Sequence, residues 1–298
     1  MPLQQPAWTC SNYSTAASEP LIGSAPRVDA WLLLEYRDPW ERNALEASAI
    51  PQPVKDALLA AERAIPNARL ELIRQETRRG RDGIAFFVAR SSPSGSALYR
   101  FDLRAYEDVL ELDLPAVVNG DARFEAQRAG EPLFVVCTNG RRDACCARNG
   151  LPLARAMAQA APGGVWECTH LGGHRLGPNV VSLPDGLMYG RVQAGDVGAI
   201  LDSSQINLDL LRGRSCFDPP AQAAEFFVRA ELNIRAATQL LLDDVSQTGP
   251  GQWTVTLRLG DLQRNVRVEQ APAGYATFTS CGDKEPKEIL EFRLVGIG

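Results

Sequence analysis

Residues 137–146 read CTNGRRDACC, and residues 166–190 read WECTHLGGHRLGPNVVSLPDGLMYG. The second segment contains both histidines of the chain, His170 and His174. Four of the seven cysteines also lie in these two segments, namely Cys137, Cys145, Cys146 and Cys168. Thiolate and imidazole are the ligands that borderline and soft metal ions prefer. Their concentration in one part of the chain predicts a metal or cluster site there.

The residues around these segments predict alternating strands and helices. An apolar strand is expected to lead to Cys137, and a polar loop is expected over residues 138–146. The expected order is a strand at 133–136, a helix at 151–161, a strand at 165–168, hairpin strands at 180–183 and 187–192, and a helix from 196. This is the order of a thioredoxin-like fold in which the loop 169–179 replaces one helix.

The preceding part of the chain predicts a similar order of elements. Strands are expected at 30–37, 69–74, 84–90 and 97–103, with helices at 54–64 and around 105–110. We therefore predict two thioredoxin-like units in tandem, of which the first lacks ligands. One continuous sheet, or an unrelated first domain, would contradict this tandem arrangement.

The last third of the chain predicts an α+β extension. Pro219-Pro220 is expected to open a long amphipathic helix over 220–243. Short strands are expected at 253–259, 265–269, 276–280 and 289–294. The predicted fold class is therefore α/β, with an N-terminal α/β domain at 1–125, a cluster-binding domain at 126–205 and the extension at 206–298.

The composition predicts a globular protein of the cytoplasm. The 298 residues carry a net charge of −5, which argues against a nucleic-acid partner. No apolar run is long enough to span a bilayer, and the first residues lack the pattern of a secretory signal. Seven cysteines are then expected as reduced thiols. Residues 1–28 read as an irregular arm, on which Cys10 is expected to be a spare thiol.

The spacing of the soft ligands argues against two common kinds of site, a zinc-protease site and a thioredoxin-type disulfide-exchange site. Gly172-Gly173 between the histidines disfavours a helix, so His170 and His174 are expected on a loop. Leu171 follows the first histidine where a zinc protease would carry its general-base glutamate. A Cys-x-x-Cys pair at a helix start is also absent, which weakens a disulfide-exchange function.

The two cysteine- and histidine-rich segments resemble those of the sucrase/ferredoxin-like family, a branch of the thioredoxin-like ferredoxins. Residues 19–40 (EPLIGSAPRVDAWLLLEYRDPW) and 211–225 (LRGRSCFDPPAQAAE) also resemble this family. In the family, a Cys-x8-Cys pair and a His-x3-His pair hold a [2Fe-2S] cluster. The resemblance implies four ligands in this chain, which are Cys137, Cys146, His170 and His174. Cys145 is an extra thiol and an alternative to Cys146, and the resemblance favours roles beside the cluster for Arg142 and Asp143.

A [2Fe-2S] cluster with mixed ligands implies one-electron transfer rather than a stand-alone enzyme. Histidine ligands raise the reduction potential, and the second imidazole nitrogen can couple electron transfer to proton transfer. The chain lacks a flavin or nicotinamide fingerprint, so electrons are expected from a redox partner protein. Two other interpretations remain: a structural Cys2His2 zinc site in a binding module, and a thiol-based reductase using Cys145 or Cys146.

Overall fold

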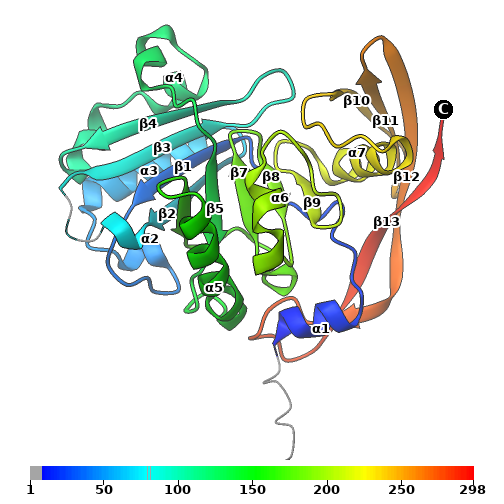
Figure 1. The fold of residues 1–298 in the computed structure, drawn as a ribbon, viewed down its shortest axis with the longest axis horizontal. Helices are drawn as coiled ribbons and strands as arrows, with labels where there is room; N and C mark the ends of the chain where they lie inside the picture. Colours follow the sequence, from blue (N-terminus) through cyan, green and yellow to red (C-terminus); the bar gives the residue numbers. More distant parts are fainter. Residues whose placement is uncertain (1–8, 79, 81) are drawn as a thin grey trace, which may run out of the picture.

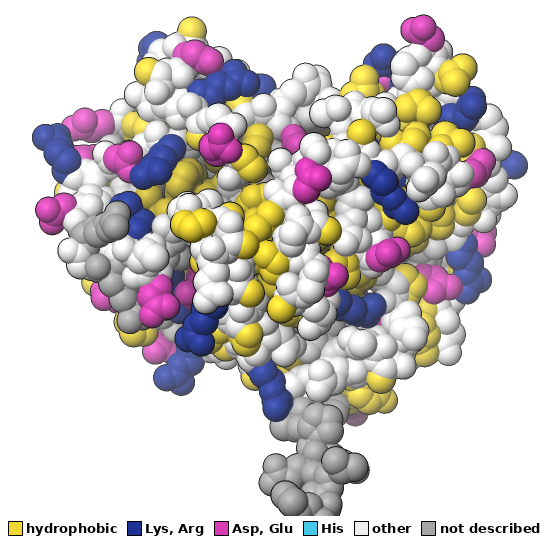
Figure 2. Space-filling model, in the orientation of Figure 1, with side chains coloured by type: hydrophobic (Ala, Val, Ile, Leu, Met, Phe, Trp, Pro, Cys, Tyr) yellow, Lys and Arg dark blue, Asp and Glu magenta, His cyan; other side chains and the backbone are white. Residues whose placement is uncertain are grey.

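The computed structural model describes residues 9–78, 80 and 82–298 (Figure 1). They form a mixed α/β structure with a large curled sheet of nine strands and a second, antiparallel sheet of four strands. In this part of the chain, no helix is both long and apolar enough to cross a membrane. Acidic and basic side chains are interspersed over the face drawn in Figure 2, so neither sign of charge dominates the described surface of that face.

The first half of the large sheet is built from residues 30–103. Its strands are β1 (Ala30–Glu35), β2 (Ala68–Arg74), β3 (Ile84–Arg90) and β4 (Ala97–Leu103). Helices α2 (Ala44–Ala47) and α3 (Gln52–Ala64) connect β1 to β2. The segments that follow are η1 (Glu76–Arg78), η2 (Tyr106–Glu111), α4 (Leu114–Val118) and η3 (Ala122–Gln127). The strands and helices expected in this half are found, and the helix expected near residue 105 is the 3-10 helix η2.

The second half begins with β5 (Leu133–Cys137), α5 (Ala144–Ala160) and β6 (Val165–Cys168). It continues with η4 (His174–Leu176), β7 (Val180–Leu183), β8 (Leu187–Tyr189), η5 (Ala194–Asp196) and α6 (Val197–Leu201). A last strand, β9 (Leu211–Arg214), pairs with β8 and was not predicted from the sequence.

The two halves repeat one topology within a single sheet. In each half the first two strands are parallel, the third is antiparallel to the first, and the fourth is antiparallel to the third. The halves join where β2 pairs antiparallel with β6, through Ile73 opposite Cys168 and Arg74 opposite Glu167. The sheet order is β4-β3-β1-β2-β6-β5-β7-β8-β9. The prediction of separate tandem units is therefore corrected to two repeated halves of one continuous sheet.

The central strands are buried on both faces, which explains their continuous apolar sequences. In β1, Leu32 and Leu34 pack into one core with α3, whereas Trp31 and Leu33 point to the opposite face. In β5, Val135 and Cys137 point to that same opposite face and share a core with Trp31 and Leu33. Residues of both halves thus surround the side of the sheet on which Cys137 lies.

Helix α5 begins seven residues before the predicted start at residue 151. Asp143 has extended backbone and its side chain accepts a hydrogen bond from the Cys145 N–H, so it is the N-cap of the helix. Pro152 therefore lies inside α5, whereas in a helix that began at residue 151 it would lie in the first turn. The early start places Cys145 and Cys146 on a helix rather than on the predicted loop.

The C-terminal part differs from its prediction at several boundaries. Helix α7 (Pro219–Leu232) is shorter than expected, because Asn233 adopts a left-handed conformation (φ 52°) and ends it. Residues predicted as the end of that helix belong to β10 (Leu240–Gly249), which pairs with β11 (Gln252–Leu259). Two predicted strands form one long strand, β12 (Leu262–Thr277), which pairs with β13 (Lys287–Ile297). The second sheet has the order β10-β11-β12-β13.

The start of the described chain is helical rather than irregular. Helix α1 (Cys10–Ala16) begins after Thr9, whose side chain accepts a hydrogen bond from the Asn12 N–H. The helix lies beside the loop between β12 and β13, so the start of the described chain contacts a segment near its C-terminal end in sequence (Figure 1). The predicted arm is therefore tied to the rest of the molecule from residue 9 onward, and residues 1–8 lie outside the described part.

The packing of α5 against the end of β5 depends on Gly150. A Cβ atom at this position would overlap the carbonyl oxygen of Cys137. We expect Gly150→Ala to lower the free energy of unfolding by about 1–3 kcal/mol, the usual cost of overpacking. Urea denaturation measures the change, with Gly198→Ala in α6 as control because a Cβ there meets nothing within 4 Å. Equal stability of the two variants would contradict the close approach.

Candidate metal centre

The four side chains predicted as ligands lie together at one end of β5. The Sγ atoms of Cys137 and Cys146 are 3.4 Å apart. The Nδ1 atom of His174, the first residue of η4, lies 3.3 Å from the Sγ of Cys146. The ring of His170 lies beside that of His174, with centroids 4.6 Å apart. The structure thus brings the two cysteines and two histidines into one group.

Helix geometry separates the neighbouring thiols Cys145 and Cys146. Successive side chains of an α-helix point about 100° apart, since 3.6 residues make one turn. The Cys146 side chain points to Cys137 and His174. The Sγ of Cys145 lies instead 3.4 Å from that of Cys10. Of the two alternatives that the sequence left open, Cys146 is the one that adjoins the histidines.

The pKa values of Cys137 and His174 are shifted toward the forms that bind metals, whereas the hydrogen bond to Cys137, and then burial, raise the pKa of Cys146. Hydrogen bonding with Cys146, and then with Cys168, holds the pKa of Cys137 well below the ordinary value of a cysteine. Cys168 is fully buried and sits opposite Cys137 in the pairing of β5 with β6. Burial, and then repulsion from His170, lower the pKa of His174 and favour its neutral form. Thiolate and neutral imidazole are the forms in which these side chains bind metals.

One buried ring nitrogen of this group is available to a ligand. The Nδ1 of His170 is buried and has no hydrogen-bond partner among the described residues. Buried polar atoms of native proteins normally have such a partner. An imidazole nitrogen left free beside thiol groups fits coordination of a metal or cluster. The donor set of two thiols and two imidazoles suits both a mixed-ligand [2Fe-2S] cluster and a tetrahedral zinc ion.

The loop between the two histidines is held from behind by Arg212. This buried side chain donates hydrogen bonds to the Gly172 carbonyl and to Asn179 Oδ1, each at 2.9 Å. Asn179 in turn donates to the Gly173 carbonyl at 3.0 Å. Gly173 has φ 72°, and a Cβ there would collide with the Arg212 guanidinium. These contacts give Arg212 a structural role in supporting the loop between the two histidines.

The histidines lie nearer the surface than the cysteines. Both cysteines are buried, whereas His170 and His174 are partly exposed. His170 and Arg142 line a pocket of about 450 Å³ between these loops and the α2–α3 region. Glu71 lines the same pocket, accepts a hydrogen bond from the Thr169 hydroxyl, and has its pKa raised to about 8 by burial. The pocket provides a surface from which the histidine side of the group can be approached.

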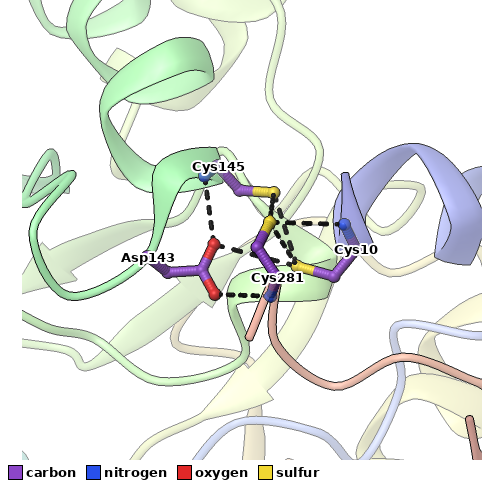
Figure 3. A group of neighbouring side chains, drawn as sticks. All are labelled: Cys10, Asp143, Cys145 and Cys281. Carbon is purple, nitrogen blue, oxygen red and sulfur yellow. Dashed lines mark hydrogen bonds between the residues drawn. The ribbon is translucent and has the colours of Figure 1, made fainter. Parts of the chain in front are cut away.

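A second group of soft ligands was missed by the sequence analysis. Cys10, Asp143, Cys145 and Cys281 each offer one ligand atom, and these atoms lie within 4.8 Å of one another (Figure 3). Cys10 was expected to be a spare thiol, and Cys281 was not singled out. The Cys10–Cys145 and Cys145–Cys281 contacts join residues 135 and 136 positions apart, so no local spacing could have revealed them.

Comparison with known proteins assigns the chain to a family. The family model described as sucrase/ferredoxin-like matches residues 21–213. The chain belongs to the sucrase/ferredoxin-like family. This match confirms the family predicted from the sequence, and it includes Cys137, Cys146 and both histidines. Cys10 and Cys281 lie outside the residues matched by the sucrase/ferredoxin-like model. No curated protein and no solved structure matched the chain.

Proposed function

We propose that this sucrase/ferredoxin-like protein binds a [2Fe-2S] cluster through Cys137, Cys146, His170 and His174 and transfers single electrons. The observation that carries the proposal is the convergence of these four side chains. Cys146 is in contact with both Cys137 and His174, and His170 lies beside His174 with its Nδ1 unpartnered among the described residues. The family assignment adds support, because the match spans all four positions.

The topology of the second half supports a thioredoxin-like cluster domain. Strands β5 and β6 are parallel and joined by α5, and β7 and β8 then add an antiparallel hairpin on the other side of β5. The first half has the same strand order, and the four proposed ligands all lie in the second half. The first half would then serve as a scaffold that covers the buried side of the centre.

The two cysteines of the proposed cluster site are more deeply buried than the two histidines. Cys137 and Cys146 are buried in the core shared by the two halves, so they would hold the cluster on its inner side. The histidines lie nearer the surface, and His170 lines a pocket together with Arg142. A bound cluster would supply one-electron redox chemistry, with a potential raised by the histidine ligands. A redox partner protein docking over this pocket would thus face the histidine side.

An anaerobic absorption spectrum with iron and sulfide analysis tests this function. We expect red-brown protein with about two irons and two sulfides per chain, the stoichiometry of a [2Fe-2S] cluster. Reversible bleaching by one electron equivalent would support electron transfer. Colourless protein with zinc bound by Cys146 and His174 would contradict the proposal and favour the structural zinc module. Metal-free protein with a reactive thiol at Cys146 would contradict it in favour of the reductase.

A further inference from the structure

Three thiols and a carboxylate from distant parts of the chain form the second group of soft ligands (Figure 3). The Sγ of Cys145 lies 3.4 Å from that of Cys10 and 3.2 Å from that of Cys281. The Sγ atoms of Cys281 and Cys10 are 3.6 Å apart, which closes a triangle. Asp143 Oδ1 lies 3.9 Å from the Sγ of Cys10. The four side chains therefore surround one common point.

The spacing of the sulfur atoms matches metal coordination better than disulfide bonding. A disulfide requires about 2.05 Å between sulfur atoms, and every pair in this triangle is much farther apart. Zinc–thiolate bonds of about 2.3 Å in tetrahedral geometry place sulfur atoms about 3.8 Å apart. In addition, three thiols cannot all be paired with one another, so one disulfide would leave a third thiol beside a carboxylate.

The surrounding hydrogen bonds orient the group. Asp143 Oδ2 accepts hydrogen bonds from the Ser280 hydroxyl at 2.8 Å and from the Cys281 N–H at 2.9 Å. Its Oδ1 accepts from the Cys145 N–H at 3.0 Å and keeps a lone pair on the side of the thiols. The Cys10 N–H approaches the Sγ of Cys281 at 3.5 Å. Such outer contacts fix the direction of ligating groups in metal sites.

We propose that Cys10, Cys145, Cys281 and Asp143 form a second metal site that binds a zinc ion. Three sulfur donors and one oxygen donor give four ligands, the number that closed structural zinc sites use. Cys10 and Cys145 are fully buried and Asp143 nearly so, while Cys281 is partly exposed on the loop between β12 and β13. The ion would therefore be enclosed and would enter from the side of that loop.

The proposed zinc site would join α1 and the loop between β12 and β13 to the start of α5. Cys10 begins α1, Cys281 lies in the loop between β12 and β13, and Cys145 lies in the first turn of α5. The next residue in that turn, Cys146, belongs to the proposed cluster site of Cys137, Cys146, His170 and His174, which we call the first centre. The zinc ion would thus fix the start of α5 and hold α1 and the β12–β13 loop against it. This role is independent of the metal bound at the first centre.

Metal analysis of four purified proteins tests the site. We expect about one zinc per chain in the wild type and less than about a tenth of that in Cys281→Ala, because a closed zinc site needs all of its ligands. The iron content of Cys281→Ala should equal that of the wild type. Cys216→Ala is the matched control, since Cys216 is a buried thiol in a different core. Cys146→Ala should retain its zinc.

X-ray absorption at the zinc edge of the wild-type protein provides a test that no folding defect can affect. We expect three sulfur neighbours at about 2.3 Å and one oxygen neighbour at about 2.0–2.2 Å. Two sulfur and two nitrogen neighbours would place zinc in the first centre and overturn the proposal. Wild-type protein without zinc, zinc retained in Cys281→Ala, or a disulfide between any two of the three cysteines would also overturn it.

Discussion

Cys146→Ala is expected to abolish the iron–sulfur chromophore, whereas Cys145→Ala is expected to preserve it. Loss of an outer-shell partner alone weakens metal binding by about 10–100-fold, so loss of a ligand should leave less than about a tenth of the iron. The Sγ of Cys146 contacts Cys137 and His174, while the Sγ of Cys145 points to Cys10 and Cys281. Visible absorbance and iron content per chain measure the difference.

The two neighbouring substitutions control for each other. Both remove one buried thiol from the first turn of α5, so both change the packing and the helix start similarly. Zinc content should show the opposite pattern, with loss in Cys145→Ala and retention in Cys146→Ala. Loss of the chromophore in Cys145→Ala together with its retention in Cys146→Ala would show that the ligand has been misassigned.

Glu225→Gln is expected to cost about 3–5 kcal/mol of stability at neutral pH, the usual cost of removing one partner from a buried ion pair. Glu225 of α7 accepts hydrogen bonds at 2.9 Å from Arg214 of β9 and from Arg229 of α7. The side chains of Glu225 and Arg229 are 1% and 0% exposed. The substitution leaves two buried guanidinium groups without a counter-charge, at the contact between the large sheet and α7.

The pH dependence of this effect has a defined sign. Burial opposes ionisation of Glu225, but Arg214 and Arg229 outweigh it and lower the pKa of the carboxyl group below its ordinary value. A group with a lowered pKa stabilises the fold above its unfolded pKa of about 4.3, and this contribution is lost as the pH falls through the folded value. The difference between wild type and Glu225→Gln should therefore shrink from pH 7 toward pH 3.

Urea denaturation at several pH values measures both the stability cost of Glu225→Gln and the direction in which that cost changes with pH. Asp243→Asn is the matched control, because Asp243 pairs with Arg258 on the surface, where the two side chains are 29% and 46% exposed. An exposed pair contributes about 0–1 kcal/mol. A cost for Glu225→Gln no larger than that for Asp243→Asn would show that the buried charges are compensated in another way.

Sequence patterns were sufficient for elements whose determinants are close together in the chain. The Cys137-x8-Cys146 and His170-x3-His174 pairs are also local in the sequence, and the family resemblance named them as ligands from these short motifs. The strands of both halves, except β9, were likewise predicted, because each buried strand carries its own apolar run. Local propensity was misleading where a later contact decided the structure, as for β10, which pairs with β11 instead of extending α7.

Tertiary structure alone decided how these pieces combine. The pairing of β2 with β6 merges the two halves into one sheet, and edge pairing of this kind leaves no local signature. The N-cap at Asp143 starts α5 early and so directs Cys145 and Cys146 to different centres. Cys10 and Cys281 reach Cys145 only because α1 and the β12–β13 loop fold back against α5. Sequence periodicity reflects contacts between residues that are a few positions apart. The group of Cys10, Asp143, Cys145 and Cys281 depends instead on contacts between residues from almost the whole length of the chain.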